Sequence, residues 1–325
     1  MEIYENILET LGNTPLVKLG RFHPGPSTLA AKIESFNPGG SVKDRIGIAL
    51  IEAGEKAGLL KPGGTIVEPT SGNTGVGLAM AANLKGYKLV CAAPDKIPKE
   101  KVALLEAMGA TVLLCPTNVE ADDPRSYYKV AERVRDEQGA YLPNQYYNQA
   151  NPEAHYRSTG PEIWRQTDGT ITHFVAGVGT GGTISGVAKY LKEQNPKVQI
   201  FGVDTVGSVY KYYFEHRELP PADQIHQYLI DGIGEDFMPA TVWWDYLDGI
   251  VTIDDKTAYR AAMDLARHES VFTGSSGGAA AAGARQIART LGADGLVVTL
   301  LPDSGERYLS KLNKAWLTEK GMLAD

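Results

Sequence analysis

The segment HFVAGVGTGGTISGVAKYLKE, residues 173–193, contains the pattern that decides the fold. An apolar run, His173–Val178, is typical of a buried strand, and a glycine-rich turn, Gly177–Thr183, overlaps its end. A helical pattern, Ile184–Glu193, follows directly. Strand, tight turn and helix in this order form the repeating unit of α/β proteins.

The same alternation recurs on both sides of this segment. The other predicted strands are Thr65–Glu68, Lys88–Ala93, Thr111–Cys115, Val198–Val203 and Leu296–Leu301. The other predicted helices are Asn73–Leu84, Lys99–Met108, Tyr127–Glu137, Lys256–His268 and Ala279–Leu291. Such alternation predicts an α/β fold with a parallel sheet and right-handed crossovers. A chain of 325 residues suits about two domains, and the polar stretch Asn144–Asn151 is a candidate boundary.

The composition excludes several classes of function. The formal net charge is −7 and the pI about 5.5, so nucleic acid and anionic membranes would exert no electrostatic attraction. The longest apolar runs, such as Leu296–Leu301, are far shorter than the roughly 20 residues that span a bilayer. The N-terminal MEIYENILET is acidic and lacks the pattern of a signal peptide. We therefore expect a cytoplasmic protein that binds neither nucleic acid nor membrane.

Cysteine and histidine usage gives no support for a disulfide or a metal site. Cys91 and Cys115 each lie in a strand-like run, so we expect two buried thiols in a reducing compartment. The six histidines show no spacing typical of metal ligands, and no metal is expected.

Ligands of open α/β sheets bind where strands end, so the turns between strands and helices are the sites to consider. The first such turn is Pro69–Gly75, which follows the strand TIVEP and begins an apolar helix. Its small residues expose backbone N–H groups, and the helix start adds positive partial charge, which together favour a carboxylate or phosphate. A well-capped helix start without a ligand is the alternative.

The second turn is the glycine-rich Gly177–Thr183, whose backbone amides can surround an anion. We interpret it as a phosphate site. The same residues match G-x-G-x-x-G, and Asp204 at the end of the next strand lies about where a ribose-binding acid would be. An NAD-binding oxidoreductase is therefore a competing hypothesis, which leaves Lys43 and the first turn unexplained.

The third turn, Phe272–Gly278, precedes the helix AAAAGARQIA and could be a plain helix cap. Lys43 stands in the segment NPGGSVKDR, residues 37–45, where Ser41 and Asp44 resemble a capping box. This predicts a helix over residues 41–56 with Lys43 in its first turn, a placement that would lower its pKa and favour a nucleophilic amine. A solvated lysine paired with Asp44 is the alternative.

Five segments together resemble one known family. They are NPGGSVKDR, EPTSGNTG, GVGTGGT, GSSGG and LPDSGERYL. Their order and spacing resemble those of the cysteine synthase/cystathionine β-synthase family, over a match that begins at LGNTPLVKL near residue 11 and ends at about residue 321. The resemblance implies an α/β, tryptophan-synthase-β-like (fold type II) protein with two open, twisted, mostly parallel sheets flanked by helices. It implies a smaller domain of residues 38–150, a larger one of residues 1–37 and 151–325, and pyridoxal 5′-phosphate between them.

The resemblance also implies roles for individual residues. Lys43 would carry the cofactor covalently and act as the catalytic residue, Asn73 would contact the ring hydroxyl, and Ser275 the pyridine nitrogen. A neutral serine there would favour β-elimination over transamination. The phosphate loop would comprise Gly179, Thr180, Gly181, Gly182 and Thr183. The substrate site would comprise Thr70, Ser71, Thr74, Gln145, Tyr146 and Gly232.

Several features resemble the cystathionine-forming branch of the family. Tyr146 follows the substrate-loop glutamine, as is typical of that branch, and the runs NPEAHY, GVDTVGSVY and DGIGEDFMP also resemble it. Glu235 replaces the tyrosine of animal and yeast members and resembles bacterial ones. The chain is expected to be a catalytic core without a heme-binding extension, and the paired regulatory module is either lacking in the protein or removed by truncation.

The resemblance implies a reaction and a state of assembly. The expected reaction condenses L-serine with L-homocysteine to L-cystathionine and water, with hydrogen sulfide release from cysteine as a side reaction. Cysteine synthesis from O-acetyl-L-serine and sulfide is the alternative within the family. Small-molecule amino-acid and thiol substrates and a homodimer are the expected partners. An amino-acid-binding module without catalysis is a further alternative.

Overall fold

The computed structural model describes residues 3–70, 72–120 and 122–323, and the chain divides into two compact units. Unit 1 contains the residues up to Leu11 together with Asn37–Asn151, and unit 2 contains Gly12–Phe36 together with the chain from Pro152 onward. The sequence placed all of residues 1–37 in the larger domain, whereas the structure places only residues 12–36 there.

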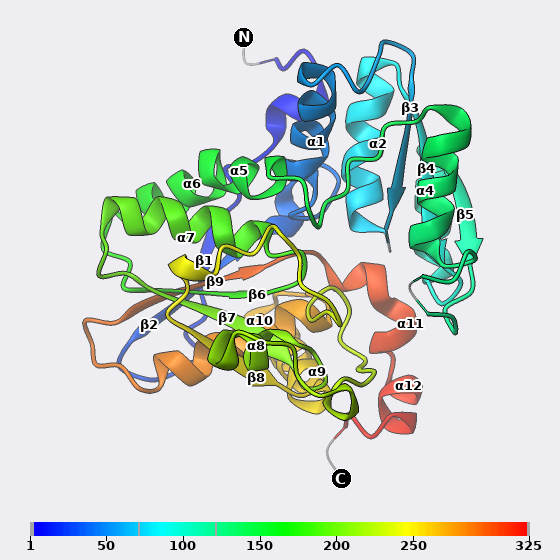
Figure 1. Cartoon of the computed structure of the whole chain (residues 1–325). Coiled ribbons are helices and arrows are strands. Elements are labelled where there is room, and N and C mark those ends of the chain that lie inside the picture. Colours follow the sequence, from blue (N-terminus) through cyan, green and yellow to red (C-terminus); the bar gives the residue numbers. More distant parts are fainter. Residues whose placement is uncertain (1–2, 71, 121, 324–325) are drawn as a thin grey trace. The chain divides into compact units, whose positions relative to one another are not determined.

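Unit 1 is built on a parallel sheet with the strand order β3-β4-β5, where β3 is Thr65–Pro69, β4 is Lys88–Pro94 and β5 is Thr111–Cys115. Its helices are η1 (Ile7–Thr10), α1 (Asp44–Lys56), α2 (Asn73–Lys85), α3 (Lys99–Ala107) and α4 (Tyr127–Gln138). Helix α5 (Ala150–Arg157) begins at its end. Figure 1 shows β3, β4 and β5 in the upper right of the view, beside α2 and α4.

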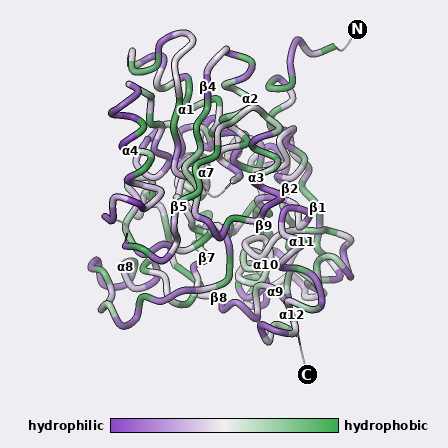
Figure 2. Tube along the Cα trace, turned by 90° about the vertical axis from the view of Figure 1, so that its right-hand side faces the viewer, coloured by the Kyte–Doolittle hydropathy of each residue, from purple (hydrophilic) through white to green (hydrophobic). Residues whose placement is uncertain are grey.

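Successive side chains of β4 point to opposite faces of the sheet, and each face is covered by a different helix. Cys91 faces α2, since a Cβ added at Gly75 would lie 3.0 Å from its sulfur. Ala92 packs on the opposite face in a cluster with Val130 and Val134 of α4. Hydrophobic residues therefore dominate β4, whereas hydrophilic ones recur along the half-exposed α4 (Figure 2).

Helices α1 and α2 cross at two glycines. A Cβ added at Gly47 would collide with the backbone of Gly77, and one added at Gly77 would lie 2.5 Å from the carbonyl oxygen of Lys43. Only residues without side chains permit this approach of one backbone to another. The crossing therefore fixes the backbone of Lys43 against the second turn of α2.

Unit 2 is built on a six-stranded sheet with the order β1-β2-β9-β6-β7-β8. Its strands are β1 (Leu16–Lys18), β2 (Thr28–Ile33), β6 (His173–Gly177), β7 (Gln199–Thr205), β8 (Gly249–Ile253) and β9 (Leu296–Leu301). Strand β1 pairs antiparallel with β2, and the other neighbours pair in parallel. The predicted mostly parallel sheet is confirmed.

The helices of unit 2 connect these strands. They are η2 (Glu34–Phe36), α6 (Thr159–Gln166), α7 (Gly182–Gln194), α8 (Tyr210–His216), η3 (Ala222–Gln224), η4 (Trp244–Tyr246), α9 (Asp255–Asp264), a π-helical turn η5 (Leu265–Glu269), α10 (Ser275–Ala288), η6 (Gly305–Tyr308), α11 (Leu309–Leu312) and α12 (Lys314–Glu319).

Helix α10 lies in the core of unit 2. Its alanines pack against Val203 of β7 and Val297 of β9 on one side and Ala258 of α9 on the other. A Cβ added at Gly278 would collide with the carbonyl of Ala258, so the small residues set the short distance between α9 and α10. This packing fixes the N-terminus of α10, where Ser275 lies.

The six predicted strands and the predicted helices are present, with ends shifted by a few residues. The helix that carries Lys43 begins at Asp44 rather than at Ser41, so Lys43 is its N-cap residue and the prediction that it lies in the first turn is wrong. Both cysteines are buried and unbridged, as predicted. Along the part of the chain that the structure describes, no helix combines the length and apolarity needed to cross a membrane.

Candidate active site

Each of the three predicted ligand-binding turns begins a helix at a glycine. The N-cap residues are Gly72 for α2, Gly181 for α7 and Gly274 for α10. Helix starts are usually satisfied by a Ser, Thr, Asp or Asn side chain at this position, which glycine cannot supply. The three helices therefore lack a side-chain cap from their N-cap residues, an arrangement that suits an external anion.

The carbonyl groups of the glycine-rich loop of α7 are fixed by two side chains. Tyr210 donates its hydroxyl to the Gly179 carbonyl over 2.6 Å, and the Thr241 hydroxyl donates to the Thr180 carbonyl. In a trans peptide the N–H points opposite to the C=O. The N–H groups of Thr180 and Gly181 therefore face away from these side chains, which is the arrangement that a phosphate requires.

Two hydrogen bonds of one histidine also hold the first turn of α7. His155 is buried, and its Nδ1 lies 2.8 Å from the hydroxyl of Thr159. Its Nε2 lies 3.2 Å from the hydroxyl of Thr183. The last residue of the predicted phosphate loop is thus tied to α5 and α6 through one imidazole ring.

Asp231 and Gly232 connect this loop to Ser275. A Cβ added at Gly179 would collide with the Gly232 carbonyl, so Gly232 lies directly against the loop. The backbone N–H of Asp231, one residue earlier, donates to the Ser275 hydroxyl oxygen over 3.1 Å. Unit 2 therefore brings together three of the predicted elements: the phosphate loop, Gly232 and Ser275.

The hydroxyl of Ser275 is suited to act as a donor. The side chain is only 2% exposed, and its oxygen already accepts the Asp231 N–H. The Tyr259 hydroxyl is a further hydrogen-bond partner of Ser275, and a bound acceptor such as an unprotonated ring nitrogen would compete with it for the Ser275 hydrogen. The turn before Ser275 is fixed by Asp303, whose carbonyl accepts the Thr273 hydroxyl over 3.1 Å and whose carboxylate accepts the Tyr308 hydroxyl over 2.5 Å.

In unit 1 the loop before α1 positions Lys43. The Asp44 carboxylate accepts the N–H of Gly39 over 2.7 Å and the N–H of Ser41 over 3.3 Å. The Ser41 hydroxyl oxygen accepts the Lys43 N–H over 3.2 Å. Asp44 therefore stabilises this turn through backbone groups, and the Lys43 side chain is half-buried.

The predicted substrate loop is also organised in unit 1. The Thr70 hydroxyl oxygen accepts the Gly72 N–H over 3.2 Å. The Thr74 hydroxyl donates to Oε1 of Gln145 over 2.7 Å, which leaves the Gln145 side-chain NH2 group as a donor for a carboxylate. Asn73 begins α2 and Tyr146 follows Gln145, both half-buried, while Ser71 lies outside the described residues.

The competing dinucleotide hypothesis fails at Asp204. This residue is 1% exposed, and its carboxylate accepts the N–H groups of Thr205 over 2.8 Å and Lys211 over 2.9 Å. It stabilises the connection from β7 to α8, so neither oxygen faces outward to bind a ribose. Burial raises the pKa of this carboxyl, as expected for an interior group.

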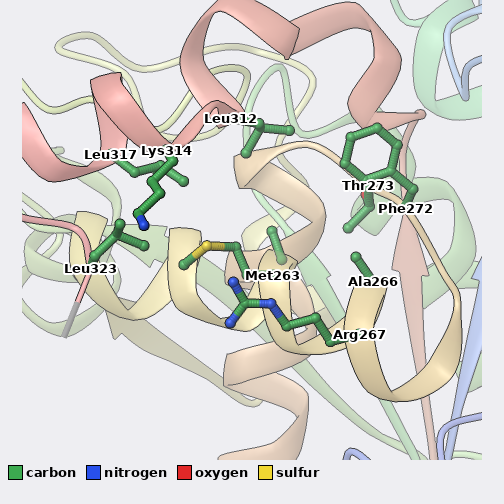
Figure 3. Close-up of a pocket in the computed structure, with 10 residues that line it drawn as sticks. Met263, Ala266, Arg267, Phe272, Thr273, Leu312, Lys314, Leu317 and Leu323 are labelled. Atoms are coloured by element: carbon green, nitrogen blue, oxygen red, sulfur yellow. The ribbon is translucent and has the colours of Figure 1, made fainter.

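Unit 2 contains a pocket of about 400 Å³ that the third turn borders. Met263, Leu317 and Leu323 are among the residues that line it, with Arg267 and Lys314 on exposed positions (Figure 3). Phe272 and Thr273 also reach it, just before the turn of Ser275. Among the residues that the structure describes, its lining includes none of the predicted site residues.

The residues present fit pyridoxal phosphate. They offer a phosphate loop with oriented N–H groups, a buried hydroxyl donor, a half-buried lysine and a second anion-binding helix start. The chain belongs to the family of pyridoxal-phosphate dependent enzymes, whose model matches residues 7–303. Its cofactor is pyridoxal phosphate, and the predicted fold class is confirmed.

Curated relatives match the whole chain. Cystathionine beta-synthase from the rabbit, Oryctolagus cuniculus, is 43% identical over 329 residues, which cover 100% of this chain and 59% of the rabbit protein. Cystathionine beta-synthase from Saccharomyces cerevisiae is 40% identical over 337 residues, which cover 98% of this chain and 65% of the yeast protein. The chain thus spans about three fifths of the length of these relatives.

Solved structures match the fold closely. The O-acetylserine dependent cystathionine beta-synthase from Helicobacter pylori superposes with a TM-score of 0.86 at 36% identity, covering 96% of this chain and 99% of that one. The O-ureido-L-serine synthase superposes with a TM-score of 0.87 at 34% identity, covering 97% of this chain and 99% of that one.

The residues that support the candidate site are not evident from the sequence. Tyr210, Thr241 and His155 hold the predicted phosphate loop, and Gly77 contacts the backbone of Lys43. Glu68 carried a visible signal, because it is an ionisable residue inside the apolar strand that leads to the substrate loop.

Proposed function

We propose that this protein catalyses a β-replacement on a serine-type amino acid, forming L-cystathionine from L-serine and L-homocysteine. The observation that carries the proposal is the identity of 43% with a cystathionine beta-synthase along the whole chain. The two anion-binding turns support it, because the cofactor has a phosphate and the substrate a carboxylate.

When bound, pyridoxal phosphate supplies the electron sink that acidifies the Cα proton of the amino acid. In this proposal Thr180, Gly181 and their neighbours bind the phosphate through N–H groups. Ser275 donates its hydroxyl hydrogen to the ring nitrogen. Asn73 contacts the ring hydroxyl, and Gln145 with the start of α2 binds the substrate carboxylate.

Lys43 moves the protons. Its neutral amine removes the Cα proton, and the resulting ammonium protonates the departing β-oxygen, which leaves as water. Lys43, again a neutral amine, takes the proton of the homocysteine thiol as the sulfur bonds to the β-carbon, and it then delivers this proton to Cα. Hydroxide is a poor leaving group, so this second role of Lys43 is essential for serine and less so for an acylated serine.

A second candidate uses O-acetyl-L-serine as the first substrate. The Helicobacter pylori protein, described as O-acetylserine dependent, matches 96% of this chain. Within the family, O-acetyl-L-serine with sulfide would give cysteine, and hydrogen sulfide release from cysteine is a further expected reaction. We also propose a homodimer in the cytoplasm, which size-exclusion chromatography with light scattering would test.

The deciding experiment is a substrate titration of the purified protein followed by its visible absorbance. A change of the cofactor band on adding L-serine without thiol, and cystathionine production on adding L-homocysteine, would support the proposal. A response to O-acetyl-L-serine alone would establish the second candidate. A protein that stays colourless in the presence of pyridoxal phosphate would refute both.

A further inference from the structure

Glu68 is a buried carboxylate next to the substrate loop. It lies in β3, two residues before Thr70, and is 0% exposed. One carboxylate oxygen accepts the Asn144 N–H over 2.8 Å, and the other accepts the Gln145 N–H over 3.0 Å. Both hydrogen bonds lie within unit 1.

The backbone at Asn144 is shaped to make these two bonds. Asn144 has φ 53°, in the left-handed region that asparagine tolerates better than most residues. Successive N–H groups at such a position converge on one anion and form a small concave site. The preceding residues run along β3, since the Tyr141 N–H donates to the Thr65 carbonyl over 2.8 Å.

Gln145 is held from three sides. Glu68 accepts its N–H, the Asn151 side-chain NH2 donates to its carbonyl over 2.8 Å, and the Thr74 hydroxyl donates to its Oε1 over 2.7 Å. The side chain is 4% exposed, so it has little freedom to reorient. The direction of its remaining NH2 donor is thus set by contacts that include Glu68.

We propose that Glu68 is a positioning residue for the substrate carboxylate, because it gathers the N–H groups of Asn144 and Gln145 and so fixes Gln145 beside the start of α2. This inference rests on the proposed function, in which Gln145 binds that carboxylate. Glu68 itself does not touch the substrate.

The ionised form of Glu68 is the form that holds both N–H groups, since a protonated carboxyl keeps only one strong acceptor. Burial raises the pKa of Glu68 to about 7, against the effect of the two backbone hydrogen bonds. The titratable groups that face it are Cys91 of β4 and Tyr141, and burial raises the pKa of each to about 12. Both neighbours are neutral near pH 7, so the hold on Gln145 should weaken as the pH falls below about 7.

The test compares the Glu68→Gln holoenzyme with wild type in two titrations of the cofactor band. L-serine carries the carboxylate, and ethanolamine is the same molecule without it. We expect the variant to bind L-serine about tenfold to a hundredfold more weakly, as for other supporting partners of a binding group, while its affinity for ethanolamine stays within about twofold. The amide hydrogens of Asn144 and Gln145 should exchange faster in the variant.

The matched control is Val134→Ala, which truncates a core residue of the same unit. This variant should have a lower melting temperature, but the ratio of its affinities for L-serine and ethanolamine should equal that of wild type. In the wild-type protein below about pH 7, the amide hydrogens of Asn144 and Gln145 should exchange faster than the intrinsic pH dependence of exchange alone would give. This measurement does not require the variant to fold.

If Glu68→Gln weakens the binding of L-serine and of ethanolamine equally, or leaves L-serine binding unchanged, the inference is overturned. Protection at Asn144 and Gln145 that does not depend on pH or on Glu68 would also overturn it. A wild-type protein that responds to neither L-serine nor O-acetyl-L-serine would instead refute the proposed function, so the two failures are distinguishable.

Discussion

Replacing Gly77 by alanine tests whether the crossing of α1 and α2 positions Lys43. The added Cβ would lie 2.5 Å from the Lys43 carbonyl oxygen and 3.1 Å from Cα of Asp44. Ordinary contact begins at 3.4 Å, so the backbone of Lys43 must move by about 0.9 Å. Both atoms belong to the backbone, so no side chain can rotate away to relieve the clash.

Two opposing terms set the change in stability. Overpacking typically destabilises by about 1–3 kcal/mol, whereas alanine favours a helix over glycine by about 1 kcal/mol. We expect a net loss of about 0–2 kcal/mol in the free energy of unfolding. The effect on activity should be larger, because catalytic groups tolerate displacements of only about 0.5 Å. We expect kcat/KM to fall by about tenfold to a hundredfold.

The assay is steady-state β-replacement with the proposed substrates, together with urea unfolding. Gly292→Ala is the control, because a Cβ there meets nothing within 4 Å and the residue lies outside the helices and strands. It should change neither quantity measurably. Wild-type kcat/KM in a Gly77→Ala protein that contains cofactor would refute the argument that this crossing sets the position of Lys43.

Three further predictions concern single groups. Because the pKa of Glu68 is raised from 4.5 to about 7, the folded protein binds this proton more tightly than the unfolded chain does. The free energy of unfolding should therefore fall by about 3 kcal/mol as the pH rises from about 4.5 to 7, and pH-dependent urea unfolding should show this slope missing in Glu68→Gln. Tyr210→Phe removes the hydrogen bond to the Gly179 carbonyl, which is worth about 1 kcal/mol. The affinity for pyridoxal phosphate, measured by absorbance titration of the cofactor-free protein, should therefore fall about fivefold. An unchanged affinity would contradict the role of Tyr210 in orienting the loop. Lys43→Ala should abolish turnover. Mass spectrometry after borohydride reduction should detect covalently attached cofactor in the wild-type protein and not in the variant. Turnover by the variant would refute the assignment of Lys43 as the catalytic residue.

The strands that could be predicted from the sequence have an apolar pattern that is not interrupted by a charged residue. Strand β9, LVVTLL, is apolar throughout, and its bounds agree with the prediction. Strand β2, TLAAKI, was missed because Lys32 interrupts it. Lys32 is 0% exposed and pairs with Glu162 at 2.8 Å, while its ammonium also donates to Gln166 over 3.0 Å. A charge neutralised by a residue 130 positions away cannot be recognised as buried from local sequence.

The residues of the candidate site also differ in whether adjacent sequence is enough to predict them. The glycine-rich turns and Lys43 are visible in the sequence because backbone conformation and helix starts depend on adjacent residues. Tyr210 and Thr241 were not predicted, since their role depends on which carbonyls they meet after folding. Glu68 is intermediate: its presence in an apolar strand was visible, but its partners Asn144 and Gln145 follow β3 by more than 70 residues.

The pairing of β2 with β9 has a consequence for folding during synthesis. Ile33 of β2 aligns with Leu301 of β9, so the sheet of unit 2 joins the two ends of the chain. At about 5–20 residues per second, the partner of β2 would leave the ribosome roughly 13–54 s after β2 itself. The sheet of unit 1, which lies between them in sequence, is complete long before that. Until then β2 has only the antiparallel β1 as a neighbour, so its other edge stays unpaired, and chaperones that bind emerging chains should act on this edge until β9 emerges.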